Sequence, residues 1–196
     1  MQLKILLSAT AVRQIIGPVD RPVENITYDS RRVQRNSLFV ALRGEKADGH
    51  QFIGQAIDKG ASVIVAEREN TDPRVTCLVV ENTRAALADI AAAYYRHPAR
   101  KLKLAAVTGT NGKTTTTFLI KHICETAGMG CGLIGTVRYE IGERLLPAIR
   151  TTPESLDLQE LLAQIANAGC KAAAMEVSSH ALAQDRTRGL EWNVWR

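Results

Sequence analysis

Apolar and polar positions follow two different periods along the chain, and the change between them predicts an α/β protein. Short apolar runs have the length and residue types of buried strands, at 38–42, 62–66, 75–80, 104–107 and 172–177. Several segments between these runs repeat apolar residues at helical spacing instead, as Leu87, Ile90 and Tyr94 do. Strands and helices that follow one another in this way favour a mostly parallel sheet covered by helices.

The same pattern predicts several elements in more detail. A short strand is expected at 26–30, and one longer strand-like stretch at 132–139. A helix that ends at Gly60 should bury Phe52, Ile53, Ala56 and Ile57. The helix after residue 112 should bury Ile120, Ile123, Cys124 and Ala127. A last helix, capped by Thr152 with Pro153 in its first position, should bury Leu158, Leu161, Leu162 and Ile165.

A short charged stretch after Pro98 divides this pattern into two predicted domains. Residues 1–98 form a small α/β unit, and residues 102–196 begin a second α/β domain with its own strand and helix sequence. The chain has 196 residues, of which 45% are hydrophobic, so both parts can bury a core.

Composition narrows the classes of partner. The net charge of +5 is spread over pairs and short clusters, which suits phosphorylated small molecules and equally an ordinary solvated surface. Aromatic residues make up only 5%, so nucleic acid is not a favoured partner, and the absence of an apolar run of about 20 residues argues against a membrane span. Four cysteines without C-x-x-C spacing indicate reduced core residues of a cytoplasmic protein.

A glycine-rich loop follows the strand at 104–107 and predicts a phosphate-binding site. It reads Gly109, Thr110, Asn111, Gly112, Lys113, Thr114, Thr115. The glycines let successive N–H groups converge on an anion, and the following helix adds its positive N-terminal end. In this arrangement Lys113 reaches the terminal phosphates of a nucleotide and Thr114 ligates Mg²⁺. The alternative is a glycine turn with a surface lysine.

Two further polar sets are Thr151–Thr152, ahead of a predicted helix, and Glu176 with Ser178, Ser179 and His180, after the strand at 172–177. In an open α/β sheet ligands bind beyond the carboxyl ends of the strands, so we expect both sets to converge with the glycine loop. Glu176 ends the apolar strand at 172–177 and is a candidate second ligand for the Mg²⁺ held by Thr114; otherwise it bonds to neighbouring amides. His180 fits a general base, a metal ligand or, preferably, a packed neutral histidine. Ser178 and Ser179 lack a nucleophile elbow and suggest a helix cap. Asp29 suggests either a ligand contact or a side-chain-bonded turn.

Three of these segments resemble the Mur ligases. They are Thr108–Thr115, Arg150–Glu154 and Met175–Leu182, the last reading M-E-V-S-S-H-A-L. The first domain agrees, because Tyr28–Arg31, Leu38–Gly44 and Ala47–His50 are similar to the UDP-precursor domain of this family. Within the family, the M-E-V-S-S-H string resembles the members that add the third residue of the peptidoglycan stem peptide.

The resemblance implies an ADP-forming amide ligase that uses ATP and Mg²⁺. Its substrates would be UDP-N-acetylmuramoyl-L-alanyl-D-glutamate and a free amino acid, by preference diaminopimelate, joined through an acyl phosphate. Lys113 and Glu176 would be catalytic, and residues 109–115 would hold ATP. The uridine nucleotide would be held by Tyr28, Ser30, Glu45, Lys46 and Ala47. The muramoyl-peptide would be held by Thr151, Thr152, Ser178, Gln184 and Arg186.

The sequence stops at Arg196, before the segments in which this family carries a carbamylated lysine and a C-terminal domain, so we expect either a fragment of a longer enzyme or a truncated product. The sheet would then lack its later strands, so we expect low stability and no amide ligation by this chain alone. A monomer is expected. Two other functions remain open: a non-catalytic module that binds the UDP-precursor, and a P-loop kinase or generic NTPase.

Overall fold

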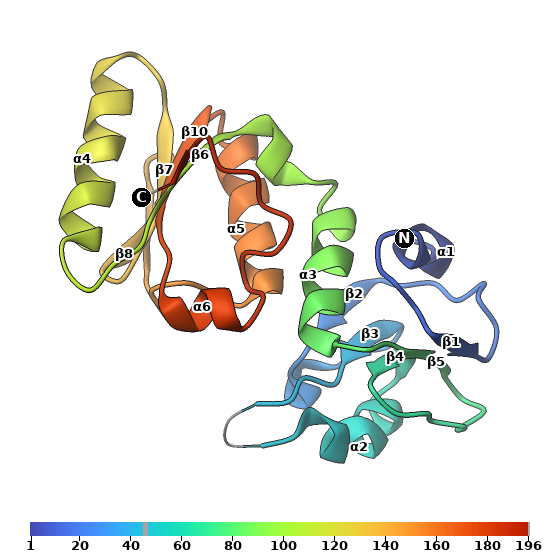
Figure 1. Ribbon diagram of the computed structural model, residues 1–196. Coiled ribbons are helices and arrows are strands. Elements are labelled where there is room, and N and C mark those ends of the chain that lie inside the picture. Colours follow the sequence, from blue (N-terminus) through green and yellow to red (C-terminus); the bar gives the residue numbers. More distant parts are fainter. Residues whose placement is uncertain (45–46, 196) are drawn as a thin grey trace. The chain divides into compact units, whose positions relative to one another are not determined.

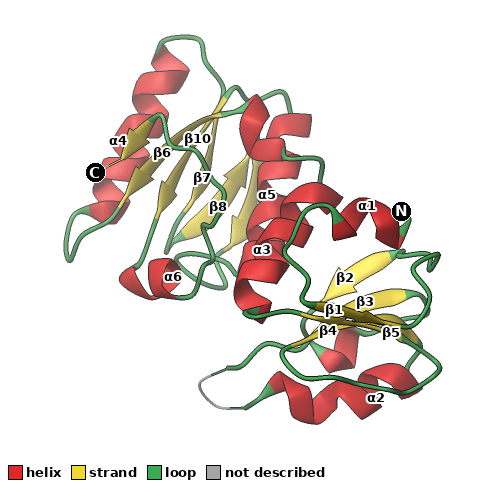
Figure 2. Cartoon of the chain, turned by 45° about the vertical axis from the view of Figure 1, so that its right-hand side comes forward, coloured by secondary structure: helices red, strands yellow, loops and turns green. Residues whose placement is uncertain are grey.

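The structure is a computed structural model that describes residues 1–44 and 47–195. The chain divides into two compact units, one of residues Met1–Tyr94 and one that begins at Tyr95. Each unit has its own sheet and its own helices (Figures 1 and 2).

The first unit contains a five-stranded sheet in the order β1-β5-β4-β3-β2. Its strands are β1 (Gln14–Ile16), β2 (Asn25–Thr27), β3 (Ser37–Val40), β4 (Ala61–Ala66) and β5 (Thr76–Val79). Strands β2 to β5 pair in parallel, and β1 is antiparallel to β5 at one edge. All residues of β3, β4 and β5 are buried, which explains why these strands appear in the sequence as continuous apolar runs.

The helices of this unit pack on the sheet and on one another. The helices are α1 (Leu3–Leu7), α2 (Ile53–Asp58) and α3 (Thr83–Tyr94), with 3-10 turns at η1 (Ser30–Arg32) and η2 (Gly49–Phe52). Ile53, Ala56 and Ile57 of α2 pack with Phe39 and Ile64 of the sheet in one buried cluster. The three residues are those predicted for this helix, whereas the predicted Phe52 is 39% exposed and lies just before it.

The second unit contains a six-stranded sheet in the order β11-β6-β10-β7-β8-β9. Its strands are β6 (Lys103–Val107), β7 (Cys131–Ile134), β8 (Arg138–Ile141), β9 (Arg144–Pro147), β10 (Ala172–Glu176) and β11 (Val194–Trp195). Strands β11, β6, β10 and β7 are parallel, and β8 and β9 continue the sheet as an antiparallel hairpin. The edge strand β11 leaves Val194 and Trp195 exposed.

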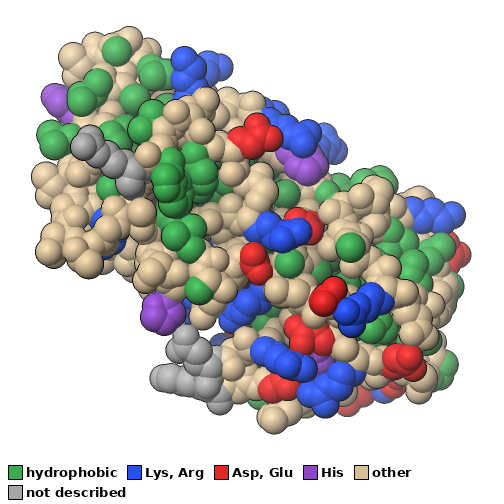
Figure 3. Space-filling model, in the orientation of Figure 1, with side chains coloured by type: hydrophobic (Ala, Val, Ile, Leu, Met, Phe, Trp, Pro, Cys, Tyr) green, Lys and Arg blue, Asp and Glu red, His purple; other side chains and the backbone are tan. Residues whose placement is uncertain are grey.

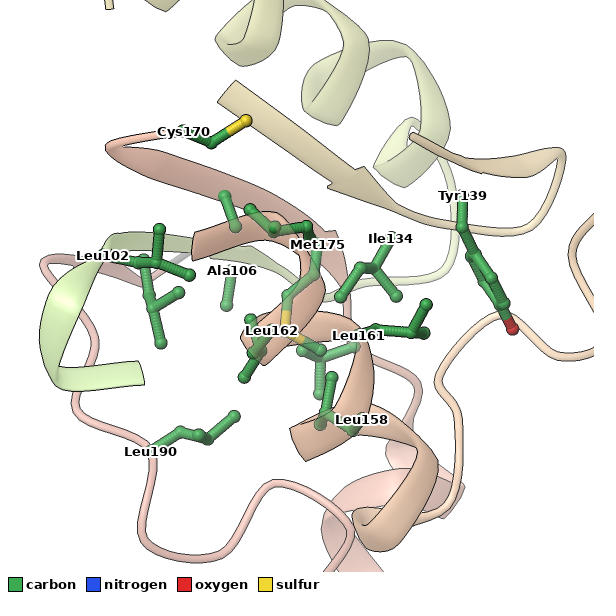
Figure 4. Packing of buried hydrophobic residues seen from close by; sticks show 14 of the residues in the cluster. Leu102, Ala106, Ile134, Tyr139, Leu158, Leu161, Leu162, Cys170, Met175 and Leu190 are labelled. Atoms are coloured by element: carbon green, nitrogen blue, oxygen red, sulfur yellow. The ribbon is translucent and has the colours of Figure 1, made fainter. Parts of the chain in front are cut away.

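Two helices lie on opposite faces of this second sheet (Figures 1 and 2). They are α4 (Lys113–Thr126) and α5 (Ser155–Asn167), accompanied by α6 (Ser179–Ala183) and the 3-10 turn η3 (Pro98–Lys101). Alternation along β10 serves both faces, because Ala172 and Ala174 pack on the α4 side while Ala173 and Met175 pack on the α5 side. The α5 stripe is the one predicted, with Leu158, Leu161, Leu162 and Ile165 buried (Figure 4).

The prediction for α4 was wrong in part. Ile123 is 66% exposed and Ala127 is exposed, whereas Ile120 and Cys124 pack half-buried on the sheet. The buried positions of α4 are Thr117 and Lys121. Helical periodicity counted apolar residues alone and therefore placed the buried face about one residue away from its actual position.

Lys121 is buried because it has an acidic partner across the helix–sheet interface. Its Nζ lies 3.3 Å from Oε2 of Glu140 on β8, and it also pairs with Glu125 one turn along α4. Arg138 donates from Nε to the other Glu140 oxygen at 2.8 Å. Burial alone would lower the pKa of Lys121, but the two carboxylates raise it above its ordinary value.

The stretch 132–139, predicted as one strand, is broken by a turn between β7 and β8. The sequence pattern also gave no sign of the β8–β9 hairpin, whose outer strand β9 is mostly exposed. In an exposed strand that begins with a charged residue, the alternation of apolar and polar residues is too weak to be recognised in a single sequence.

Charges of both signs lie next to one another on the face shown in Figure 3. Surface ion pairs of the described residues include Arg74–Asp72 at 2.7 Å and Arg68–Asp48 at 3.1 Å. None of the helices in the described part of the chain is long and apolar enough to cross a membrane.

Replacing Leu162 tests whether the α5 cluster stabilises the second unit. Leu162 has no exposed surface, so Leu162→Ala should lower the free energy of unfolding by about 2–5 kcal/mol. Leu145→Ala is the matched control, because Leu145 is 60% exposed on β9 and should change stability by about 0.5 kcal/mol or less. Denaturant unfolding of both variants measures the difference, and equal losses would contradict the assignment of this core.

Candidate functional site

The loop between β6 and α4 has the backbone shape of an anion cradle. Gly109 and Gly112 adopt positive φ angles of 130° and 77°, and Gly112 immediately precedes α4. A Cβ at Gly112 would meet no atom within 4 Å, so the backbone angle, and not space, requires glycine there. The loop is exposed, and the 14-residue helix α4 points its free N-terminal amides toward it.

Lys113, the first residue of α4, folds back over this loop. Its Nζ donates to the carbonyl oxygens of Gly109 at 2.7 Å and Thr110 at 3.4 Å. The ammonium group is therefore already placed above the loop, where it could exchange these neutral acceptors for an anionic one.

Glu176, at the carboxyl end of β10, connects three strand ends. Glu176 is only 1% exposed. Its Oε1 accepts from the Thr114 hydroxyl at 3.0 Å and from the Thr136 N–H at 2.9 Å, and its Oε2 accepts from the Thr136 hydroxyl at 3.0 Å. The structure thus brings Thr114 and Glu176, the two predicted metal ligands, into contact.

Gly135, at the end of β7, makes this approach possible. A Cβ at this position would lie 2.5 Å from Oε1 of Glu176, closer than any side chain tolerates. Any larger residue would force the carboxylate away from Thr114 and Thr136. Glycine is required here by close contact, in contrast to its role at Gly112.

The surroundings of Glu176 fit a cation. Within the described residues, all of its hydrogen-bond donors are neutral, and no lysine or arginine forms an ion pair with it. A buried carboxylate is stabilised by an opposite charge, which these hydroxyls and amides do not supply. The described residues contain no cluster of three or more metal-binding side chains. A divalent ion here would therefore depend on ligand oxygens besides Thr114 and Glu176, as a nucleotide-bound Mg²⁺ does.

The predicted muramoyl-peptide residues lie next to Glu176. Thr151 Oγ1 is 3.0 Å from Thr136 Oγ1. Thr152 Oγ1 donates to the Glu176 carbonyl at 2.9 Å and accepts from the Ser178 N–H at 3.0 Å. These bonds fix the loop before α5 to the end of β10.

Arg186 and Gln184 complete this group. Arg186 donates from Nη1 to the Thr152 carbonyl at 2.9 Å and from Nη2 to Gln184 Oε1 at 2.6 Å. Its Nε lies 3.6 Å from a carboxylate oxygen of the buried Glu154. All five predicted residues, Thr151, Thr152, Ser178, Gln184 and Arg186, therefore belong to one hydrogen-bonded region.

Two predictions at this edge of the sheet were wrong and one was confirmed. Thr152 does not cap α5, which begins at Ser155 after Glu154, because the Thr152 hydroxyl is bonded to β10 instead. His180 is exposed on α6, not packed. Ser178 does cap a helix, since its side chain accepts from the Ala181 N–H at the start of α6.

The predicted uridine-nucleotide residues lie in the first unit. Ser30 is buried and donates to Gln55 Oε1 at 2.8 Å, Tyr28 is half-buried, and Ala47 is exposed. Glu45 and Lys46 lie outside the described residues. The Asp29 side chain accepts from the Arg31 N–H and holds a turn, which was one of its two predicted roles. The Arg31 guanidinium also donates to this carboxylate, and that side-chain bond is the main cause that lowers the pKa of Asp29.

Sequence reasoning missed Thr136 and Tyr139. Thr136 follows the apolar strand β7, so the rule that ligands gather at strand ends could have identified it. Tyr139 lies at the margin of the buried cluster, with its hydroxyl directed toward a neighbouring loop (Figure 4). That hydroxyl donates to the Arg150 carbonyl at 2.6 Å and accepts from the Arg150 N–H at 3.1 Å, next to Thr151. A single sequence contains no signal for this pairing.

Two family models match the chain. Residues 22–95 match the model described as Mur ligase family, catalytic domain, and residues 107–194 match the Mur ligase middle domain. One similar curated protein is the UDP-N-acetylmuramoyl-L-alanyl-D-glutamate--2,6-diaminopimelate ligase of Clostridium tetani. It is 47% identical over 98% of this chain and 41% of its own length. The chain thus spans about two fifths of the length of such relatives.

The chain is also similar to solved structures of Mur ligases. A structure of a UDP-N-acetylmuramoyl-L-alanyl-D-glutamate--2,6-diaminopimelate ligase matches all of this chain and 39% of its own, with a TM-score of 0.80 and 26% identity. The MurF ligase of Thermotoga maritima, solved in complex with ADP, matches 79% of this chain and 32% of its own, with a TM-score of 0.52 and 25% identity.

Removing one hydroxyl tests whether Tyr139 holds the loop that carries Thr151. Tyr139→Phe keeps the buried ring but removes both bonds to Arg150, each of which contributes about 0.5–1.5 kcal/mol. Loss of the one bond made by the Arg150 N–H should make amide hydrogen exchange at Arg150 about 2- to 13-fold faster, since this is the fold-change that about 0.5–1.5 kcal/mol gives.

Tyr94→Phe is the control for this experiment, because the Tyr94 hydroxyl donates to the Glu24 carbonyl in the first unit. It should leave exchange at Arg150 unchanged. Unaltered exchange in Tyr139→Phe would show that other contacts hold the loop.

Proposed function

The chain belongs to the Mur ligase family, and from this premise we propose that it forms the UDP-precursor and nucleotide portions of an ATP-dependent, ADP-forming amide ligase. The ligase would join an amino acid to the D-glutamate carboxylate of UDP-N-acetylmuramoyl-L-alanyl-D-glutamate. The names of similar proteins support this reaction. Since the chain spans 41% of the first of them, the activity is proposed for the whole protein.

The observation that supports this proposal best is the contact between Thr114 and Glu176 beside the glycine loop. A hydroxyl at the start of a helix and an acidic side chain at the end of a neighbouring strand are the ligands that P-loop enzymes use for nucleotide-bound Mg²⁺. We assign residues 109–115 to the phosphates of ATP, and Thr114 and Glu176 to Mg²⁺. When bound, the ion would offset charge on the transferring phosphoryl group.

The side chains of this chain would act mainly by position and charge. A carboxylate is a poor acylating agent, so its phosphorylation by ATP is the expected first step, and an amine then displaces phosphate from the acyl phosphate. Lys113 would offset charge on the phosphoryl oxygens, and Glu176 would hold the ion. Thr151, Thr152, Ser178, Gln184 and Arg186 would hold the muramoyl-peptide beside them.

In the first unit, Tyr28, Ser30, Glu45, Lys46 and Ala47 would hold the uridine nucleotide. The domains are proposed as residues 1–98 for the UDP-precursor and 102–196 for the ATP-binding part. We further propose diaminopimelate as the added amino acid, a cytoplasmic location and a monomer. The names of the similar ligases support the first of these, and four free cysteines support the second.

Binding measurements on the 196-residue chain discriminate between this proposal and its alternatives. Calorimetric titration should show binding of both UDP-N-acetylmuramoyl-L-alanyl-D-glutamate and ATP with Mg²⁺. Binding of the UDP-precursor without ATP would favour a non-catalytic binding module. ATP hydrolysis that needs no UDP-sugar would favour a kinase or generic NTPase. If neither ligand binds, the proposal is wrong.

Lys113→Ala tests the nucleotide site separately. Charge-assisted contacts to phosphate contribute about 1.5–3 kcal/mol each, so ATP should bind about 10- to 150-fold more weakly. Affinity for the UDP-precursor should not change. Lys171→Ala is the matched control, because Lys171 is exposed just before β10, at the opposite end of the strand from Glu176. Equal ATP affinity in the two variants would remove Lys113 from the site.

A further inference from the structure

Thr136 lies between the residues assigned to the two ligands, although neither assignment includes it. Its hydroxyl donates to Glu176 Oε2 at 3.0 Å and is 3.0 Å from the Thr151 hydroxyl. Its backbone N–H separately donates to Glu176 Oε1 at 2.9 Å. One side chain therefore contacts a residue assigned to Mg²⁺ and a residue assigned to the muramoyl-peptide.

The number of available protons fixes the direction of these hydrogen bonds. An ionised carboxylate only accepts hydrogen bonds, so the single hydroxyl proton of Thr136 is used toward Glu176. The contact between Thr136 and Thr151 then requires Thr151 to donate. As a result, Thr151 Oγ1 presents only lone pairs to a ligand, and it should accept from an N–H or O–H group.

We propose that Thr136 is a positioning residue that couples the binding of the muramoyl-peptide substrate to the binding of the metal–nucleotide. This inference rests on the proposed function. A substrate that donates to Thr151 orders the series Thr151–Thr136–Glu176 and thereby fixes the carboxylate that would receive the cation. The second ligand then binds to a site that is already ordered and loses less conformational entropy.

Coupling of this kind is reciprocal. If the UDP-precursor raises the affinity for Mg²⁺-nucleotide by some factor, the nucleotide raises the affinity for the precursor by the same factor. A residue with a purely structural role would change stability or both affinities together. It would not change the ratio between affinities measured with and without the other ligand.

Thr136 can be substituted without altering the packing of the core. Thr136 is exposed, so Thr136→Val alters no core packing and keeps a β-branched side chain of the same shape. The backbone N–H bond to Glu176 survives in every variant, which preserves one anchor of the carboxylate. Thr136→Ser keeps the hydroxyl and should restore the coupling. Thr126→Val is the matched control, because the Thr126 hydroxyl bonds to the His122 carbonyl of its own helix and, among the described residues, to no side chain of the site.

The experiment titrates the chain with Mg²⁺ and a non-hydrolysable ATP analogue, in the absence and presence of saturating UDP-N-acetylmuramoyl-L-alanyl-D-glutamate. The unaltered chain, Thr136→Ser and Thr126→Val should bind the analogue at least about fivefold more tightly when the precursor is present. In Thr136→Val the two affinities should be equal, while the unfolding midpoint stays within about 2 °C of the unaltered value.

Two results would overturn the inference. One is a coupling factor in Thr136→Val equal to that of the unaltered chain. The other is an unaltered chain that binds both ligands without any coupling. By contrast, failure of the unaltered chain to bind either ligand would count against the proposed function, so the two failures are distinguishable.

Discussion

The burial of Glu176 is the constraint on which the second unit depends. Its carboxylate is 1% exposed and, in the described part of the chain, is bonded only to neutral donors. Such a group is tolerated when its lone pairs are satisfied, and here that requires Thr114 from α4, Thr136 after β7 and a glycine at 135. Three separate segments are thus held at one point by the hydrogen bonds of one side chain.

The parallel sheet makes this convergence possible. Strands β6, β7 and β10 run in the same direction, so the residues that follow each of them emerge at the same edge. The α4 and α5 helices fill the two faces and fix the strands from both sides. Further along α4, Lys121 forms a buried ion pair with Glu140 of β8. Polar and apolar contacts together therefore fix the helix that begins at the glycine loop.

The hydrogen bonds of the site differ in how much they restrict its side chains. Thr152 is bonded on both sides to the end of β10, and Arg186 is bonded to Thr152 and Gln184. These groups are ordered before any ligand arrives, which lowers the entropic cost of binding. Lys113 is different, because this half-buried side chain donates to the neutral carbonyls of Gly109 and Thr110 and can exchange them for an anion. The site therefore combines ordered side chains around Thr152 with one lysine that can change its hydrogen-bond partners.

The sequence alone determined the α/β class, most strands, the α5 stripe and the glycine loop, because these depend on local periodicity and on glycine chemistry. It also predicted that Thr114, Thr151 and Glu176 would lie close together, because the ends of parallel strands meet. Only the tertiary structure revealed the contacts of Thr136, the Tyr139–Arg150 bonds and the buried Lys121–Glu140 ion pair of α4. It also showed that the Thr152 hydroxyl bonds to the Glu176 carbonyl and does not cap a helix. These features depend on partners far away in the chain, and no local pattern records such partners.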